Sequence, residues 1–188
     1  MRRRRLLELA PAALLGSAGC TGRMGSANQN TSSEGQRYEA SVPDADRENA
    51  GLLLAVNVLQ STIKPNNPAL LEFALTNVAE ERKSITTGVL WPFGVVYAVE
   101  SEGDREFLLW SDQYEESDNV KIVNGTVSAT AVGVQRSIRP NKTVTQSFSI
   151  PHNTDSLSPS RYRITNQSGE RFNVGEVQFD ITLHISRV

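Results

Sequence analysis

The sequence Val177-Gln178-Phe179-Asp180-Ile181-Thr182-Leu183-His184-Ile185, close to the C-terminus, decides the fold class. Apolar and polar residues alternate strictly along it. Successive side chains of a β-strand point to opposite faces, so this alternation is typical of a strand with one buried and one solvated face. We therefore predict one long final strand over residues 176–188.

Four earlier segments, residues 54–59, 71–76, 144–150 and 161–165, show the same period of two. Clusters of turn-forming residues separate them, and the region has no helical period. Short alternating strands punctuated by turns favour an all-β sandwich or barrel for residues 51–188. This length suffices for a single domain with a hydrophobic core.

Residues 1–19 have the features of a secretory signal peptide. The basic run Arg2-Arg3-Arg4-Arg5 precedes a short apolar stretch and then small residues, the usual order in such a peptide. The apolar stretch is too short to span a bilayer, which takes about 20 apolar residues. The arginines and the following Leu6-Leu7 resemble the twin-arginine export pattern, and this resemblance implies export in a folded state.

Cys20 is the only cysteine and follows Ser17-Ala18-Gly19. This segment resembles the lipobox of exported lipoproteins, with Ser17 where a leucine is usual. We expect cleavage before Cys20 and a two-chain lipid on its side chain. Two acyl chains anchor a protein stably, so we expect it on the extracellular face of the cell membrane.

Residues 20–50 are expected to form a flexible polar linker behind the lipidated cysteine. They are rich in small and polar residues and lack apolar periodicity. Such a segment cannot bury enough surface to offset its ordering entropy. The linker would lift the sandwich away from the lipid headgroups.

Charge and motifs exclude several kinds of partner. Without residues 1–19 the chain has 15 basic and 20 acidic residues, a net charge of −5, which argues against a nucleic-acid partner. An acidic cluster lies within residues 111–119, but its spacing matches no calcium-binding EF-hand loop. A solvated charged loop is the better interpretation. The cluster consists of Asp112, Glu115, Glu116 and Asp118.

The sequence gives little support to catalysis. It has no nucleophile elbow, phosphate-binding loop or dinucleotide-binding glycine pattern. His152 lies close to Asp155 and several serines, but a solvated loop histidine is a better interpretation than a catalytic triad. His184 falls on the polar face of the last strand, and two separate histidines do not make a zinc site. We expect no enzymatic activity, no metal and no cofactor.

Five segments resemble the BsuPI-type proteinase-inhibitor family. This resemblance implies a single immunoglobulin-like antiparallel β-sandwich and raises protease inhibition as an activity. The overall organisation, from the arginine-rich start to the small β-domain, is similar to that of haloarchaeal surface lipoproteins. The five segments are residues 71–77 ending in Asn77, the aromatic-rich strand 91–99, Leu109-Trp110-Ser111, the turn 138–143 with Asn141 in place of glycine, and residues 158–162 ending in Tyr162.

Two tryptophans are the bulkiest apolar residues of the chain. We expect Trp91 and Trp110 to pack in the core, because a sandwich commonly buries a tryptophan. Where exposed beside a tyrosine, such residues would be the natural contacts for a partner. Trp91, Trp110 and Tyr114 are therefore the candidate partner contacts.

Four asparagines begin an Asn-x-Ser/Thr sequence and are candidate glycosylation sites. They are Asn30, Asn124, Asn141 and Asn166. All lie in the linker or at expected turns, and we expect one or two of them to be used.

The sequence favours a lipid-anchored surface protein whose sandwich is a non-catalytic binding module. Its expected partners are the membrane, through the lipid on Cys20, and an unidentified protein or surface ligand. Two alternatives stay open. One is an inhibitor of an extracellular subtilisin-like protease, and the other is an accessory subunit of a membrane-associated complex.

Overall fold

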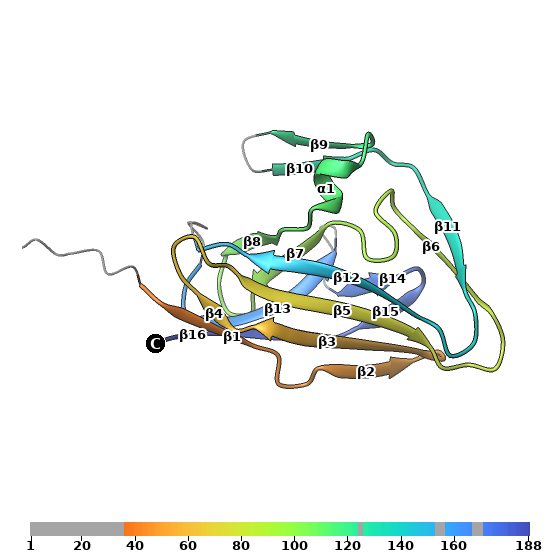
Figure 1. Ribbon diagram of the computed structural model, residues 1–188, viewed down its shortest axis with the longest axis horizontal. Coiled ribbons are helices and arrows are strands. Elements are labelled where there is room, and N and C mark those ends of the chain that lie inside the picture. The colour runs from red at the N-terminus through yellow and green to blue at the C-terminus, as the bar shows by residue number, and fades with distance from the viewer. Residues whose placement is uncertain (1–35, 124–125, 153–156, 167–170) are drawn as a thin grey trace, which may run out of the picture. The chain divides into compact units, whose positions relative to one another are not determined.

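The computed structural model describes residues 36–123, 126–152, 157–166 and 171–188 (Figure 1). In these residues, antiparallel strands form two main sheets with one hydrophobic core between them. The prediction of an all-β antiparallel sandwich is therefore confirmed. Among the described residues, no helix has the length and apolar character needed to cross a membrane. Residues 1–35, with the expected signal peptide and Cys20, lie outside the described part.

The first sheet has six strands, and alternate side chains cover its inner face. Ile63, Ala98 and Leu183 are fully buried there, as the period of two requires. The Tyr162 hydroxyl donates to the carbonyl of Ser158 (2.9 Å) and accepts from its N–H (3.1 Å), the tyrosine corner of immunoglobulin-like sandwiches. In spatial order the strands are β4 (Thr62–Ile63), β1 (Tyr38–Ser41), β16 (Thr182–Arg187), β13 (Ser160–Asn166), β7 (Val96–Glu100) and β8 (Glu106–Leu109).

The second sheet has four strands and faces the first across the core. Phe73 and Phe148 from this sheet form an aromatic cluster with Phe93 and Phe172, with ring centroids 4.9–6.4 Å apart. Aromatic pairs at these distances add to the stabilisation from burial. The strands, in spatial order, are β12 (Thr143–Ile150), β5 (Ala69–Asn77), β3 (Leu52–Gln60) and β2 (Asp46–Asn49).

The two sheets are joined along one side by Trp110, which directly follows β8. Its N–H donates to the carbonyl of Ser149 on β12 (2.9 Å), and the Ser149 N–H donates back (2.7 Å). This pair of bonds connects the edge strands β8 and β12. The backbone groups at those two positions are therefore paired, which limits the open edge of each sheet.

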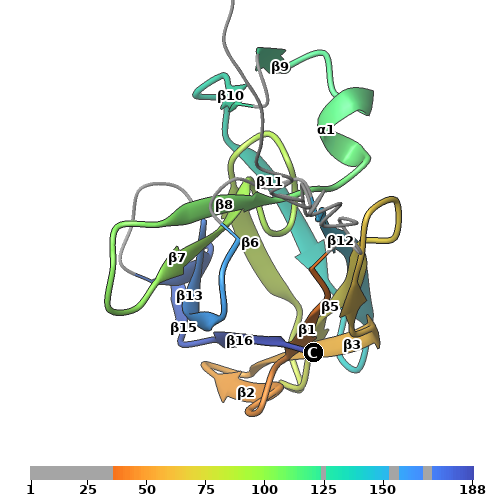
Figure 2. The same ribbon diagram turned by 90° about the vertical axis from the view of Figure 1, so that its left-hand side faces the viewer.

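Three two-stranded ribbons and one short helix complete the described part (Figure 2). Figures 1 and 2 show the β9–β10 hairpin and α1 beyond β8, and the β6–β11 ribbon beyond the ends of β5 and β12. The ribbons are β6 (Lys83–Thr87) with β11 (Val134–Ile138), β9 (Val120–Val123) with β10 (Thr126–Ala129), and β14 (Phe172–Val174) with β15 (Val177–Phe179); the helix is α1 (Gln113–Glu116).

Asn77 forms the corner at which the β5–β12 pair turns into the β6–β11 ribbon. Its side chain is fully buried, and its Nδ2 donates to the carbonyls of Glu81 (2.8 Å) and Ile138 (2.9 Å). Its Oδ1 accepts from the N–H of Ala79 (3.0 Å). The backbone of Asn77 is also paired, with Asn141 and Lys142. These bonds satisfy the polar groups that the corner would otherwise bury unpaired.

The sandwich begins earlier than the sequence predicted, so the boundary between linker and domain at residues 50 and 51 is wrong. β1 pairs with both β4 and β16, and β2 pairs with β3. β1 has only two inward positions, Tyr38 and Ala40, which is too short for a clear alternation. β2 is a charged edge strand, Asp46-Arg47-Glu48-Asn49, with no apolar residue to mark it.

The long final strand and the aromatic-rich strand are also shorter than predicted. Residues 176–188 contain two strands, β15 and β16, which belong to different sheets. Phe179, Ile181 and Leu183 all face the core across the break, so the alternation conceals the change of partner. In the segment 91–99, residues 91–95 form turns and only β7 is a strand.

Candidate functional site

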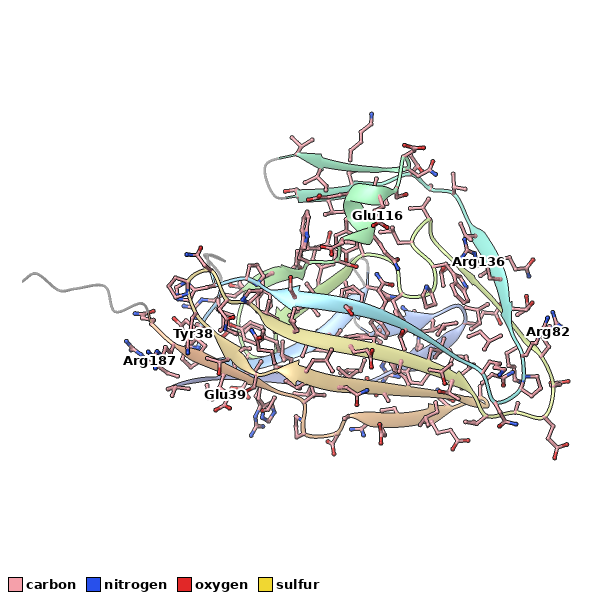
Figure 3. All side chains as sticks on the ribbon, in the orientation of Figure 1. Tyr38, Glu39, Arg82, Glu116, Arg136 and Arg187 are labelled. Atoms are coloured by element: carbon pink, nitrogen blue, oxygen red, sulfur yellow. The ribbon has the colours of Figure 1, made fainter. Side chains whose placement is uncertain are left out.

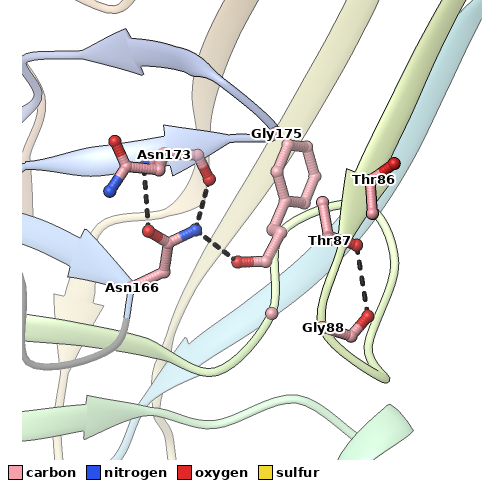
Figure 4. A pocket seen from close by; sticks show the side chains of 8 residues that line it. Thr86, Thr87, Gly88, Asn166, Asn173 and Gly175 are labelled. Atoms are coloured by element: carbon pink, nitrogen blue, oxygen red, sulfur yellow. Dashed lines mark hydrogen bonds between the residues drawn. The ribbon is translucent and has the colours of Figure 1, made fainter. Parts of the chain in front are cut away.

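The loop of residues 88–95 contributes to the lining of two neighbouring hollows, which together we call the cleft. The first, the polar hollow, has a volume of about 250 Å³ and is shown in Figure 4. Threonine, asparagine and glycine dominate its lining. The residues are Thr86, Thr87, Gly88, Phe93, Gly94, Asn166, Asn173 and Gly175.

Asn166 organises the wall of the polar hollow. Its Nδ2 donates to the carbonyls of Phe93 (2.8 Å) and Asn173, and its Oδ1 accepts from the Asn173 N–H (2.8 Å). These bonds tie the end of β13 to β14 and to the loop (Figure 4). Asn166 is only 8% exposed, and a glycan would attach to the same Nδ2. Asn166, one of the four candidates, is therefore not accessible to glycosylation in this fold.

The apolar hollow is lined in part by other residues of the same loop and has a volume of about 460 Å³. Volumes in this range are typical of sites for small organic ligands. The two hollows share Thr87, Gly88 and Gly94. The apolar hollow is lined by Thr87, Gly88, Val89, Leu90, Gly94, Val95, Tyr97, Val127, Ala129, Thr130, Ala131, Val132 and Gly133.

The β9–β10 hairpin forms one wall of the apolar hollow. The register pairs Val120 with Ala129 and Ile122 with Val127, so these four residues share one face. Val127 and Ala129 line the hollow, and this face is entirely apolar. The neighbouring Val132 is 49% exposed, so apolar surface continues to the rim.

Gly94, which lines both hollows, allows the loop to turn. Its φ is +72°, a conformation that residues with a Cβ rarely adopt. Its N–H donates to the carbonyl of Leu90 (2.6 Å), which closes the turn. A Cβ at this position would meet no atom within 4 Å. The conformation of the backbone, rather than crowding, is therefore what requires glycine here.

Tyr97 of β7 is the one ionisable side chain among the described residues that line the cleft. Burial, with a smaller contribution from the carboxylate of Glu106, raises the pKa of this phenol. Tyr97 therefore stays neutral at physiological pH. The Thr87 hydroxyl donates to the carbonyl of Gly88 (3.2 Å). Among the described residues, no carboxylate, imidazole or ammonium lines either hollow as a general base for this hydroxyl, so the chemistry of the cleft suits binding of uncharged groups.

A third hollow, of about 340 Å³, lies along β6 between Lys83 and the β14–β15 turn. It neighbours the polar hollow, because both hollows include Thr86 and Gly175 in their lining. A Cβ on Gly175 would lie 3.4 Å from Ile85 Cγ2 and 3.5 Å from the Thr86 carbonyl oxygen. The turn therefore packs closely against β6.

The family comparison covers almost all of the chain. The family model described as "Domain of unknown function (DUF8130)" matches residues 1–184. The chain belongs to this family. No curated protein and no solved structure matches it. The matched range includes every residue that lines the cleft.

Tyr114 is a structural residue, and its prediction as a partner contact is wrong. Its side chain is 1% exposed. Its hydroxyl donates to the carbonyl of Leu109 (3.1 Å) and accepts from the N–H of Val96 (3.1 Å). Leu109 and Val96 are cross-strand partners, so Tyr114 pins the end of the β7–β8 pair. Burial is the main cause that raises the Tyr114 pKa.

The two tryptophans are half-buried and lie in different surroundings. Trp110 packs edge-on against Tyr114, with ring centroids 5.7 Å apart. The Arg136 guanidinium lies 5.4 Å from the centre of the Trp91 ring, a cation–π geometry. The Trp91 indole N–H is buried without a hydrogen-bond partner among the described residues. The two rings thus pack against the core rather than forming one shared exposed patch.

The remaining candidates from the sequence fall in several places. The His152 Nε2 lies 2.7 Å from the Gln36 carbonyl oxygen, while Asp155 lies outside the described residues. His184 lies beside Arg161 on the outer face of the six-stranded sheet. The described residues contain no group of three or more acidic, histidine or cysteine side chains that could hold a metal ion.

Asn141 is the glycosylation candidate whose position fits modification. It is exposed and adopts φ +55°, which asparagine tolerates better than most residues and which also explains its place in a turn. Asn30 and Asn124 lie outside the described residues.

The cleft and the residues that line it were not predicted from the sequence. The available signal was the pair Gly88 and Gly94 on either side of the apolar run Val89-Leu90 and Trp91-Pro92-Phe93. A long apolar loop between two glycines indicates a segment that packs back on the fold and leaves space beside it.

Proposed function

We propose that this protein is exported, anchored to the extracellular face of the cell membrane by lipid on Cys20, and acts as a non-catalytic binding module. The cleft lined in part by residues 88–95 is its binding site. One observation carries the proposal. Among the described residues, the lining of the two neighbouring hollows includes no ionisable group except a neutral tyrosine, and the apolar hollow has the volume of a small-ligand site.

The cleft favours an uncharged, amphipathic ligand. The apolar hollow would take an aliphatic or aromatic group against Leu90, Val95 and Val127. The polar hollow offers the hydroxyls of Thr86 and Thr87 to hydrogen-bonding groups of the same ligand. Apolar walls with a few placed polar groups are the usual composition of a specific small-ligand site.

The anchor is supported by the sequence of the first 20 residues. The arginine run, the short apolar stretch and the small residues before Cys20 provide an export signal and a lipidation site. The twin-arginine pattern would allow the sandwich to fold, and the cleft to form, before export. The similarity to haloarchaeal surface lipoproteins fits the same location.

A neutral apolar probe, N-phenyl-1-naphthylamine, tests whether the apolar hollow binds ligands. Its fluorescence should rise on binding to the purified chain. Ala129→Trp places an indole in the hollow and should weaken probe affinity about tenfold or more. Ser128→Trp is the matched control, because Ser128 lies on the opposite face of the same strand. Equal binding by both variants, or no binding by the unmodified chain, would reject the site.

Protease inhibition is a second candidate, favoured by the segment between β10 and β11. Residues 130–133 are all exposed, and Val132 presents an apolar side chain to solvent. Such a segment could enter the active site of an extracellular subtilisin-like protease. Stoichiometric inhibition that Val132→Asp abolishes would establish this function. Intact activity across a panel of such proteases would remove it.

A further inference from the structure

Three basic residues gather at the end of the sandwich where the described chain begins. Arg37 directly precedes β1, Lys64 directly follows β4, and Arg187 ends β16. β1 lies between the other two strands, and Tyr38 pairs with both Ile63 and Arg187. The three residues therefore occupy neighbouring positions on three adjacent strands. We call this group, Arg37, Lys64 and Arg187, the basic end; Figure 3 labels Arg187 there, close to Tyr38.

The three charges of the basic end have no ion-pair partner in the described part of the chain, whereas Arg47, for example, is paired with Asp44. Glu39 is the acidic residue nearest in the register, two positions along β1 from Arg37. Its carboxylate accepts a hydrogen bond from the Ser61 hydroxyl (3.1 Å).

His152 adds a further group to the same end. It follows β12, its ring nitrogen lies 2.7 Å from the Gln36 carbonyl oxygen, and its ring lies 6.2 Å from that of Tyr38. The end of the second sheet therefore brings a histidine to the basic end of the first. Arg37 and Arg187 are exposed, and their charges are available to an outside partner.

The chain segment that joins Cys20 to the basic end determines which partner can reach the basic end. Gln36 lies sixteen positions after Cys20, and a chain of that length spans at most about 55 Å. A lipid on Cys20 would therefore hold the basic end within reach of the membrane surface. The mature chain is acidic overall, with a net charge of −5, so an anionic surface would repel most of its other faces.

We propose that the basic end docks on anionic lipid headgroups of the membrane that holds Cys20. This inference rests on the lipid anchor of the proposed function. Docking would orient the sandwich end-on. The β6–β11 ribbon, at the opposite end in Figure 1, would then face away from the membrane, and the cleft that borders β6 would be presented to the outside.

Vesicle flotation tests the docking without the lipid anchor. The protein is residues 20–188 with Cys20→Ser, which contains the whole hydrophobic core. It should float with vesicles of phosphatidylglycerol and phosphatidylcholine at low salt, and not with phosphatidylcholine alone. High salt should release it, since electrostatic attraction to headgroups is screened.

Charge variants locate the contact. Each basic residue near an anionic surface contributes on the order of fivefold in binding, so Arg37→Glu with Arg187→Glu should weaken flotation by more than about tenfold. Glu39→Gln should strengthen it severalfold. The control is Arg82→Glu with Arg139→Glu, which makes the same change of charge at the far end, where Figure 3 shows Arg82. This pair should have a small effect.

Three results would overturn the proposal: no flotation with anionic vesicles, equal loss in both double variants, or displacement by inorganic phosphate beyond that by chloride at equal ionic strength. The last result would indicate a site for a single anion instead of a surface. The protein carries no lipid in this assay. Failure here therefore leaves the anchor at Cys20 and the cleft untouched, and failure of the anchor in cells leaves the vesicle result untouched.

Discussion

Asn77→Ala is the substitution that tests most sharply how the β6–β11 ribbon, which borders the cleft, is held in place. The change removes three side-chain hydrogen bonds of 2.8, 2.9 and 3.0 Å at the corner between β5 and β6. It leaves the N–H of Ala79 and the carbonyl of Ile138 without their partner. An alanine cannot replace any of these bonds.

The expected loss of stability follows from the count of bonds. A typical intramolecular hydrogen bond contributes about 1 kcal/mol net, so three suggest about 3 kcal/mol. The carbonyl of Glu81 belongs to an exposed residue and can bind water instead, whereas the bond to Ile138 is buried. We therefore expect the free energy of unfolding to fall by about 2–4 kcal/mol. A domain with a typical stability of roughly 5–15 kcal/mol would still fold.

Urea unfolding followed by tryptophan fluorescence measures the change, with Asn57→Ala as the control. Asn57 lies exposed on β3 and makes one long bond of 3.4 Å to Glu72, so its loss should cost less than about 0.5 kcal/mol. Asn77→Asp keeps the acceptor for Ala79 but sets a carboxylate against two carbonyls, and should destabilise at neutral pH at least as much as alanine. If Asn77→Ala costs no more than Asn57→Ala, the corner does not hold the ribbon.

Two further predictions concern Tyr114 and Cys20. Tyr114→Phe leaves the Val96 N–H and Leu109 carbonyl unpaired and should lower the free energy of unfolding by about 1–3 kcal/mol in the same urea assay. Since burial raises the folded-state pKa of Tyr114, its contribution is fully present below about pH 10 and is lost as the pH rises further, because only the unfolded state then loses the proton. Stability measured against pH should therefore fall less steeply at alkaline pH in Tyr114→Phe than in the unmodified chain, and equal slopes would contradict this. Cys20→Ser should move the protein from the membrane fraction to the medium or leave it unprocessed, as judged by fractionation and mass, and unchanged membrane retention would rule out the lipid anchor.

The sequence predicts strands well where the buried face of a strand consists of a long series of alternating apolar residues. Residues such as Leu71, Phe73 and Leu75 are all fully buried, as the alternation required. The alternation of apolar and polar residues does not reveal a strand that is defined by its backbone pairing instead of by a buried face. β2 is held by backbone pairing with β3 at an exposed edge, and the break between β15 and β16 changes the partner strand without changing which side chains face the core.

The candidate site was harder to predict than the fold, because it depends on where loops pack. The aromatic character of Tyr114 indicated a large contact but gave no direction for it. A four-residue helix turns that side chain inward, where its hydroxyl finds two backbone partners. Similarly, nothing in the sequence near Asn166 indicates that its amide reaches Phe93, which is 73 residues away. In both cases the backbone partners of the side chain, which the sequence pattern does not identify, decide its position.

Photo-cross-linking in intact cells tests the central claim, that the cleft of a surface-anchored sandwich is the binding site. A photoreactive side chain is placed at position 129, which lines the apolar hollow, and in a separate strain at position 128, which faces away from it. We expect a discrete adduct from position 129 that is absent from position 128 and is lost on adding Val127→Asp. Equal adducts from both positions, or none from position 129 in cells that display the protein, would contradict it.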